Sequence, residues 1–492
     1  MLLFALVWLV YGPVLECTEQ YSYVSASPDT MHHIASQPGG SLYWAGRWML
    51  LVCKWAPLGA AALAALFTLT AWLADTALHV PARWAGAGFA IPLAEWGWAA
   101  WRGTTLYFKS EPSLLMLVPL ATLLATALLA ALAWGVRRAV RKTAAPVPDS
   151  RKAVPWGCLL MAALSIGTAS AIAHFNENVI LTAKLKNLMW KQDWDTMIEE
   201  ARSASRPTRS VAAYHAIALQ QTGQLLDGMY DIAYDFPKLK FEQRGGGDEY
   251  ALFTTDCNFY AGLTYGAYRS AMDQIVLDGP SLYYFKRMAL CALVNGEDEL
   301  CRKYLALIRQ HPFESDFAER YAAMVGHADR VKADPELKGV TALQPQDSTN
   351  EQNYRRPLFL GYNAGLRSGT DASLLTSAAA CLYSKDLKAF LIRAEIMRAK
   401  NMRFPACMQQ AIAILALKDN SLLRQYPQVG KFVPDEIRAF LLDARPYAKD
   451  RLALRHKLKE RWLGSYVYYY YTENNDPDQV VQPQAGEKAG VN

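Results

Sequence analysis

LLMLVPLATLLATALLAALAWGV, residues 114–136, carries no charged side chain over about the 20 residues that an α-helix needs to cross a bilayer. A second uncharged stretch, APLGAAALAALFTLTAWLA, occupies residues 56–74. Core helices of soluble proteins rarely stay uncharged over such lengths. The sequence therefore predicts an integral membrane protein and excludes a wholly soluble enzyme.

Composition limits the class of partner. The chain has 492 residues, of which 52% are hydrophobic and 20% charged, with a formal net charge of +6. This charge is modest for the length, and the clearest basic cluster lies between two hydrophobic stretches, where membrane topology explains it better than nucleic acid does. We expect no nucleic-acid partner.

We expect four or five transmembrane helices within residues 1–175. The hydrophobic stretches lie at about residues 1–15, 48–74, 84–101, 114–136 and 156–173. The third is ambiguous because Glu95 lies in the middle of a Trp-rich segment, which could span the membrane, re-enter it or lie at its interface. An intramembrane carboxylate often marks a proton or substrate path, with Lys54 or Arg83 as a candidate partner, whereas Trp-rich segments favour the interface.

The loop between the last two hydrophobic stretches predicts the orientation. It contains six basic residues: Arg137, Arg138, Arg141, Lys142, Arg151 and Lys152. Short loops with this density of positive charge are usually cytoplasmic. The region after His174 is then extracytoplasmic, although Lys184 and Lys186 argue weakly for the opposite orientation. We also favour an outside location for the loop from Glu16 to Arg47, which requires residues 84–101 to span.

From residue 176 onward the pattern changes to amphipathic helices with short turns. The clearest unit is SLYYFKRMALCALVNGEDELCRKYLALIRQHP, residues 281–312, in which Gly296 lies in the turn between two helices, and another unit has its turn near Ser384-Lys385-Asp386. This spacing is typical of a tetratricopeptide-like (TPR-like) helical hairpin. We expect an all-α protein with a TPR-like domain at 176–472, an exposed linker at about 333–353 and a disordered tail at 473–492.

Common catalytic motifs are absent: HExxH, GxSxG, Walker, GxGxxG and CxxC sequences do not occur. Four residues after the first hydrophobic stretch are candidates for an enzyme at the membrane surface: Glu16, Glu19, Asp29 and His32. A solvated loop explains them more simply, because no second motif supports catalysis. We expect no cofactor and no metal site.

Five cysteines follow residue 176, and two of them could form a disulfide. Cys291 and Cys301 are nearly equidistant from the Gly296 turn, so they could face each other across the hairpin. Disulfides are permitted if the region is extracytoplasmic. Buried unpaired thiols are the simpler expectation, because cysteine is a common small core residue.

The last helical stretch has two interpretations. It carries basic residues from Arg451 to Arg461, followed by Tyr466 and the run from Tyr468 to Tyr471. This combination could rest against anionic lipid headgroups. Alternatively the tyrosines bury against the last repeat and cap it, which we favour.

Packing and turn residues also suggest a relationship. They include Glu16, Glu19-Gln20, Pro38-Gly39-Gly40 and Gly59-Ala60, and in the helical region Trp194, the stretch from Tyr214 to Leu225 with Gly223, Tyr260-Ala261-Gly262, Tyr265, Tyr268, Tyr304-Leu305 and Tyr466 to Tyr471. In these features nearly the whole chain resembles an uncharacterised family of Bacteroidota multi-span inner-membrane proteins with a TPR-like region. The resemblance implies an envelope location and no particular activity. Because the chain opens inside a hydrophobic segment without a basic leader, the sequence leaves open whether its N-terminus is complete.

The leading hypothesis is a multi-span inner-membrane protein that presents a periplasmic TPR-like domain as an interaction scaffold. Its partners would be envelope proteins or peptides together with membrane lipids, since concave repeat surfaces bind extended partners without chemistry. One alternative is a glycan or lipid transferase that uses Glu16, Glu19, Asp29 or His32. Another is a transporter subunit with Glu95 as its intramembrane functional carboxylate. The sequence does not indicate the oligomeric state.

Overall fold

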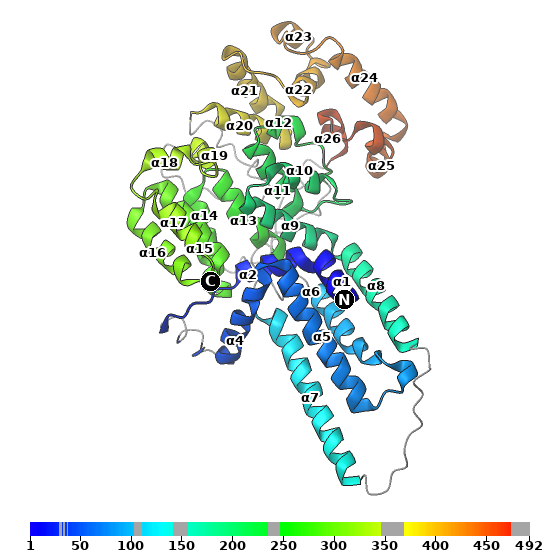
Figure 1. The fold of residues 1–492 in the computed structure, drawn as a ribbon. Helices are drawn as coiled ribbons and strands as arrows, with labels where there is room; N and C mark the ends of the chain where they lie inside the picture. The colour runs from blue at the N-terminus through cyan, green and yellow to red at the C-terminus, as the bar shows by residue number, and fades with distance from the viewer. Residues whose placement is uncertain are drawn as a thin grey trace, which may run out of the picture. The chain divides into compact units, whose positions relative to one another are not determined.

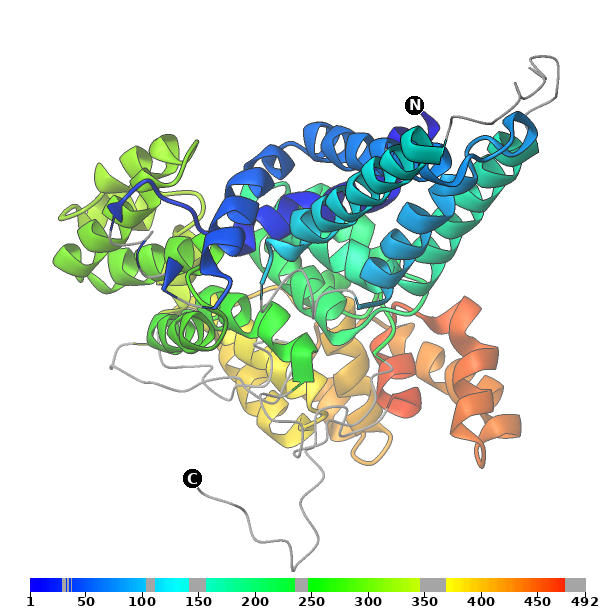
Figure 2. The same cartoon turned by 90° about the horizontal axis from the view of Figure 1, so that it is seen from below.

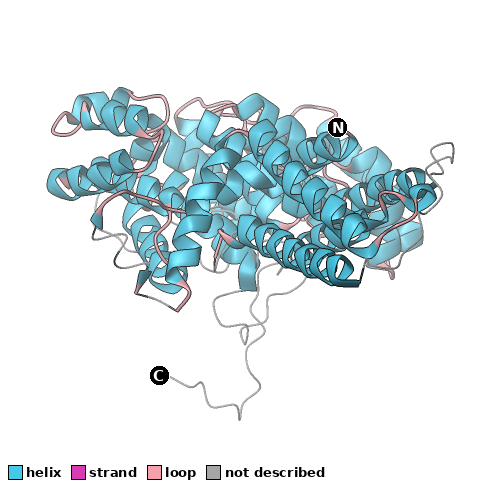
Figure 3. Cartoon of the chain, turned by 60° about the horizontal axis from the view of Figure 1, so that its bottom comes forward, coloured by secondary structure: helices cyan, strands magenta, loops and turns pink. Residues whose placement is uncertain are grey.

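The computed structural model describes residues 1–28, 32, 35–36, 38–102, 111–140, 156–234, 247–345 and 369–473. Every regular element in these ranges is a helix, and Figure 3 shows helices without strands among them. The predicted all-α class is therefore confirmed for the described part of the chain.

The chain forms two compact units. Unit 1 comprises Met1–Asn187, Gln274–Lys286 and Leu305–Glu319, and unit 2 comprises Leu188–Asp273, Arg287–Tyr304 and Arg320–Asn492. Residues 274–286 and 305–319, which the sequence pattern places in the C-terminal helical domain, thus lie in the same unit as the hydrophobic helices.

Four helices of unit 1 are long and apolar enough to cross a membrane: Leu2–Tyr21, Ala56–Leu78, Leu114–Arg138 and Trp156–Phe175. The first consists of α1 (Leu2–Leu6), the π-helical turn η1 (Val7–Tyr11) and α2 (Gly12–Tyr21), and the others are α5 (Ala56–Leu78), α7 (Leu114–Val140) and α8 (Trp156–Phe175). Figures 1 and 2 show these helices in blue to teal. Their length and composition suggest a membrane protein.

Two of the expected boundaries differ from the observed ones, and prolines explain both. The first helix continues to Tyr21 instead of ending near residue 15, because the wider turn η1 precedes Pro13, which cannot donate a backbone hydrogen bond. The second long helix begins at Ala56 instead of residue 48. Pro57 lies in its first turn, where the helix has no acceptor for an amide hydrogen.

Shorter elements connect the long helices. They are α4 (Gly40–Leu50), η2 (Leu51–Lys54), η3 (Ala82–Trp84), η4 (Ala87–Phe89) and α6 (Ala90–Arg102). The ambiguous segment 84–101 therefore consists of short turns and a 13-residue helix, which is too short to count among the four candidate spans.

Helices α5 and α7 pack against each other and run in the same direction. Both begin near α4. The short turn η2 connects α4 directly to α5, and Arg47 of α4 forms an ion pair with Glu111, just before α7, at 3.2 Å. At the opposite end, Arg137 of α7 donates hydrogen bonds to carbonyl groups at the end of α5. The chain between α5 and α7 must therefore return across the bundle, and α6 is the described helix in that return.

Asp75 organises the turn at the far end of α5. Its carboxylate accepts hydrogen bonds from the amides of Gly86 at 2.6 Å and Gly88 at 2.7 Å. A methyl group built on Gly88 would lie 2.3 Å from the carbonyl oxygen of Ala71. Only glycine therefore allows this turn to pack so closely against α5.

Unit 2 contains short helices in sequence. Its described helices are α10 (Trp194–Arg202), α11 (Arg209–Gln221), α12 (Leu225–Gly228), α13 (Gly247–Tyr260), α18 (Ala328–Ala333), α19 (Lys338–Leu343), α20 (Asp371–Tyr383), α21 (Leu387–Ala399), α22 (Ala406–Ala416), α23 (Ser421–Gln425), α24 (Val433–Ala444), η7 (Arg445–Tyr447), α25 (Arg451–Trp462) and α26 (Tyr466–Thr472). Five helices extend over both units: α9 (Glu177–Lys191), α14 (Thr264–Asp278), α15 (Leu282–Asn295), α16 (Asp298–Gln310) and α17 (Ser315–Ala322).

Helix ends in unit 2 follow one recurring pattern. Gly296 has a φ of +72°, and the amide of Glu297 donates to the carbonyl of Ala292 at 2.9 Å, which closes α15. Lys385 ends α20 with the same left-handed backbone at +57°, and Asp386 then caps α21 by accepting from the amide of Ala389. The predicted turns at Gly296 and Lys385 thus lie between consecutive helices.

A fully buried ion pair lies in the core of unit 2. Arg287 Nη2 is 2.7 Å from Asp256 Oδ1, and the hydroxyl of Tyr214 donates to the other carboxylate oxygen at 2.7 Å. The guanidinium also stacks on the rings of Phe259 and Trp190, at 4.2 and 4.7 Å. Hydrogen bonding and cation–π contacts together compensate for removing these charges from water.

Part of the expected linker at 333–353 is buried, which corrects the prediction. Leu337 and Val340 are fully buried, and Asp334 pairs with Arg320 at 2.9 Å. Asp334 is buried and accepts hydrogen bonds from the amides of Glu336 and Leu337 just before α19, which a count of Pro, Gly and Asp cannot show. Residues 346–353 and the tail from 474 onward lie outside the described residues.

The arrangement of unit 1 predicts which loops share a side of the membrane. We expect cysteines at Ala26 and Asp316 to react with a membrane-impermeant maleimide from one side, and a cysteine at His79 from the other, because all three sites are exposed and His79 follows the far end of α5. The full chain with the exposed Cys158 replaced by serine is the background. Labelling of intact and lysed cells would contradict the arrangement if all three sites reacted from one side.

Candidate functional site

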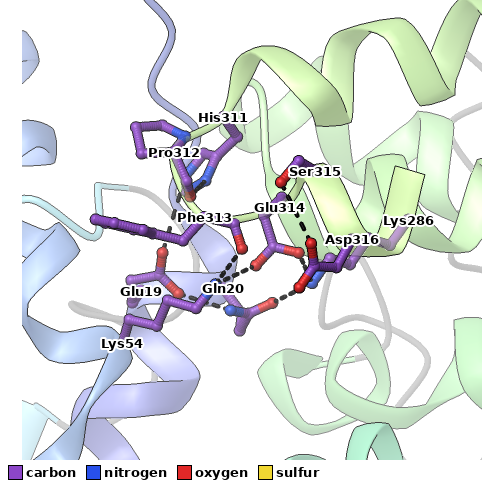
Figure 4. A network of polar contacts seen from close by, with 10 residues as sticks. All are labelled: Glu19, Gln20, Lys54, Lys286, His311, Pro312, Phe313, Glu314, Ser315 and Asp316. Atoms are coloured by element: carbon purple, nitrogen blue, oxygen red, sulfur yellow. Dashed lines mark hydrogen bonds and ion pairs between the residues drawn. The ribbon is translucent and has the colours of Figure 1, made fainter. Parts of the chain in front are cut away.

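Glu19, a candidate from the sequence, is the starting point of a buried polar cluster in unit 1. It lies in the last turn of α2 and is only 1% exposed. One carboxylate oxygen accepts a hydrogen bond from the side-chain amide of Gln20 at 2.6 Å. The other lies 3.8 Å from His311 Nε2. Figure 4 shows Glu19 facing the segment around His311.

Glu314 is the most strongly paired member of this cluster. Lys286 Nζ lies 2.7 Å from one of its carboxylate oxygens, and Lys54 Nζ lies 3.0 Å from the other. Lys286 also donates to Gln20 Oε1 at 3.2 Å, so Gln20 connects this ion pair to Glu19. We call Glu19, Gln20, Lys54, Lys286, His311 and Glu314 the charge cluster (Figure 4).

Ion pairs offset the burial of Glu314. Burial alone would raise the pKa of Glu314, but the charge and hydrogen bond of Lys286, together with those of Lys54, outweigh burial and hold this pKa below its usual value. Glu314 is therefore ionised at neutral pH. A carboxylate held between two ammonium groups meets the requirement that buried charges be paired.

His311 enters the cluster as a neutral ring. It is 2% exposed, and burial lowers its pKa to about 4 although the carbonyl of Pro312 and the charge of Glu314 act in the opposite direction. Nδ1 lies 3.0 Å from the Pro312 carbonyl oxygen, which can only accept, so Nδ1 carries the proton. Nε2 then presents its lone pair toward the Glu19 carboxyl group, 3.8 Å away.

A second buried contact lies beside the charge cluster in unit 1. Lys186 of α9 is 1% exposed, and its ammonium group donates hydrogen bonds to the hydroxyls of Tyr21 and Tyr283. The two rings stack at 4.9 Å. Lys186 is therefore a core residue, and its charge is not evidence about membrane orientation.

Two other sequence candidates, Glu16 and His32, have different surroundings from Glu19. Glu16 is half-buried and accepts hydrogen bonds from the amide of Ala56 at 3.4 Å and the side chain of Asn187 at 3.2 Å, so it caps the start of α5. His32 is exposed, and Asp29 lies outside the described residues. The four-residue enzyme site is thus not assembled among the described residues.

Glu95 and the two hairpin cysteines lie elsewhere. Glu95 lies half-buried in α6, and its Oε1 has no hydrogen-bond partner. Lys54, a suggested partner for Glu95, pairs with Glu314 instead. Cys291 and Cys301 are buried as free thiols, so the structure contains no disulfide between them.

The arrangement positions segments of the chain. Burial raises the pKa of the Cys291 and Cys301 thiols to about 12, so neither thiol is an activated nucleophile. Three or more His, Cys, Asp or Glu side chains do not converge on a metal position among the described residues. The charge cluster therefore fixes segments 281–286 and 311–314 to the ends of α2 and α5.

Sequence analysis missed three members of the cluster: Lys286, His311 and Glu314. They come from a region more than 200 positions away from Glu19, so no local spacing connects them. The sequence did contain one signal for the cluster, because Lys286 and Arg287 interrupt an otherwise apolar stretch. In the structure this stretch is buried from residue 281 to residue 293. Adjacent basic residues in a buried helix indicate ion pairs with distant carboxylates.

The family model described as "Family of unknown function (DUF6057)" matches residues 1–173 and 104–473. The chain belongs to this family. The match confirms the coarser part of the expected relationship, a family of unknown function that covers nearly the whole chain. No curated protein and no solved structure matches the chain.

His311 predicts a pH dependence of stability. Its pKa is about 4 in the folded chain against 6.5 for a free histidine, so the unfolded chain binds the proton more tightly. The stabilising contribution is present above pH 6.5 and is lost as the pH falls toward 4. When the pH is lowered from 7.5 to 5, we expect the free energy of unfolding of the unmodified chain in detergent to fall by about 2 kcal/mol more than that of His311→Gln.

The measurement is thermal unfolding of both chains at the two pH values. His456→Gln is the matched control, because His456 is an exposed histidine in α25 and should leave the pH dependence unchanged. Identical pH dependence in His311→Gln and in the unmodified chain would contradict the neutral buried state of His311.

Proposed function

We propose that the chain is a multi-span inner-membrane protein that presents a TPR-like helical region on the periplasmic side as an interaction scaffold for envelope proteins or peptides. The single observation that carries the proposal is the charge cluster. It fixes two segments of the helical region to the ends of membrane helices without assembling a catalytic constellation among the described residues. Such an arrangement is suited to presenting the helical region to envelope proteins or peptides.

Helical pairs in unit 2 support the repeat-like part of the proposal. α20 and α21 pack against each other across the Lys385 turn, and α10 packs against α11. α9 and α10 are connected by the same kind of turn, with Gln192 at a φ of +57° and Asp193 as the helix cap. Repeated helical hairpins build extended surfaces that bind proteins and peptides.

The basic residues in the last turns of α7 and in the sequence after it support the proposed orientation. Arg137 lies at the end of the bundle opposite the charge cluster, and Arg138 and the further basic residues up to 152 follow it. If this end is cytoplasmic, as the positive-inside rule favours, the cluster end is periplasmic. Burial of Lys186 removes one of the two lysines that argued for the opposite orientation.

Exposed apolar side chains near the end of unit 2 offer positions at which partners can be tested. Phe432, Leu442 and Leu452 are 85%, 68% and 69% exposed. By contrast, Tyr466 and Tyr469 in the terminal tyrosine run are buried. The tyrosines therefore cap the helices that precede them, and they leave the apolar residues of α24 and α25 available for contact.

The test is photocrosslinking in living cells with the full chain. We expect a benzophenone amino acid at Phe432, Leu442 or Leu452 to give discrete adducts with envelope proteins. The same probe at Arg302, an exposed polar position in unit 2, should give none. Adducts that disappear in Leu442→Asp, together with loss of complementation by this variant, would support a scaffold.

Complementation by Leu442→Asp at the level of the unmodified chain, with no adduct from any of the three positions, would contradict the scaffold. Activity would then be sought in the alternative functions, the transferase or the transporter subunit. Alanine at Glu16 and His32 tests the first, and Glu95→Gln tests the second.

A further inference from the structure

Four large apolar side chains of unit 1 are exposed although they lie outside the four candidate spans. Trp55, Val276, Leu277 and Phe313 are 44%, 76%, 74% and 59% exposed. We call them the apolar ledge. Single exposed apolar residues need no explanation, but these four belong to segments that polar contacts attach to the end of α2 and the start of α5.

Phe313 is held outward by a strained backbone. Its φ is +66°, a conformation that bulky side chains rarely adopt. Lys54 Nζ donates to the Phe313 carbonyl at 2.7 Å, and the Phe313 ring packs edge-on against Trp55 at 5.2 Å. Trp55 directly precedes α5, so Phe313 lies at the level where α5 begins.

Val276 and Leu277 reach the same end of the bundle by a different connection. They lie in the last turn of α14, and the chain that follows is attached to the first long helix, because the Leu282 amide donates to the Ser22 carbonyl at 3.0 Å. Gly279 lies against Arg47 of α4. Two separate segments of the helical region thus present apolar side chains where α2 ends and α5 begins.

We propose that the apolar ledge inserts into the interfacial zone of the same bilayer that α5 crosses. Aromatic residues at a helix entry favour this zone, and the lipid surface is continuous with the start of α5, next to Trp55 and Phe313. Lys54 fits the assignment, because its ammonium group lies 5.6 Å from the centre of the Phe313 ring and pairs with the buried Glu314 at 3.0 Å, so its charge is neutralised beside the ledge. The inference rests on the proposed membrane insertion of α5.

Site-directed spin labelling of the full chain in nanodiscs tests the ledge. Nitroxides at Leu277→Cys and Phe313→Cys, in a background with Cys158→Ser, should collide with oxygen several-fold more often than with a neutral nickel complex, as lipid-exposed labels do. Phe432→Cys is the matched aqueous control, because Phe432 is exposed and apolar in unit 2. Leu69→Cys is the lipid control, because Leu69 is 48% exposed in the middle of α5.

Labels at 277 and 313 that behave like the label at Leu69 would support the proposal. Labels that behave like the one at Phe432 would overturn it, and so would labels shielded from both reagents, which would indicate a protein partner or a second copy. If the Leu69 label itself favoured the nickel complex, membrane insertion of α5 would fail and the proposed function with it. The label at position 277 does not depend on the strained backbone at position 313. Misfolding of the Phe313→Cys variant alone would therefore not decide the outcome.

Discussion

Glu314 is buried between the ammonium groups of Lys286 and Lys54, at 2.7 and 3.0 Å, and this pairing constrains the rest of unit 1. A carboxylate removed from water costs several kcal/mol unless opposite charges accompany it. Lys54 precedes α5 in the hydrophobic part of the chain, whereas Lys286 and Glu314 belong to the helical region. Because the three charges can stay buried only as pairs, the distant segments that carry them must stay in contact.

The position of this pairing determines how the hydrophobic helices are ordered. Because the cluster fixes the end of α2 and the start of α5 to residues 281–314, these segments share one side of the bundle. α5 and α7 then run in parallel to the opposite end, where Arg137 donates to the carbonyl of Ala77. Helix α6 has to bring the chain back, which gives the ambiguous Trp-rich segment a structural role even though it is short.

Hydrophobicity made the class and most long helices predictable, since uncharged runs such as residues 114–136 have few alternatives to a membrane helix. Turn chemistry likewise predicted the helix ends at Gly296 and Lys385. The cluster was only half predictable, because Glu19 and Lys54 stand out near hydrophobic segments while Glu314 and His311 look like ordinary loop residues. The burial of residues 334–343 was likewise not predictable, since it depends on contacts with residues that are distant in the sequence.

The proposed scaffold depends on the claim that the charge cluster is an energetic connection between the helical region and the membrane helices. A double-mutant cycle with Lys286→Met and Glu314→Gln tests it most directly, by thermal unfolding of the full chain in detergent. The account predicts that each single change destabilises strongly and that the coupling energy is about 2 kcal/mol. Additive effects of the two substitutions would contradict it.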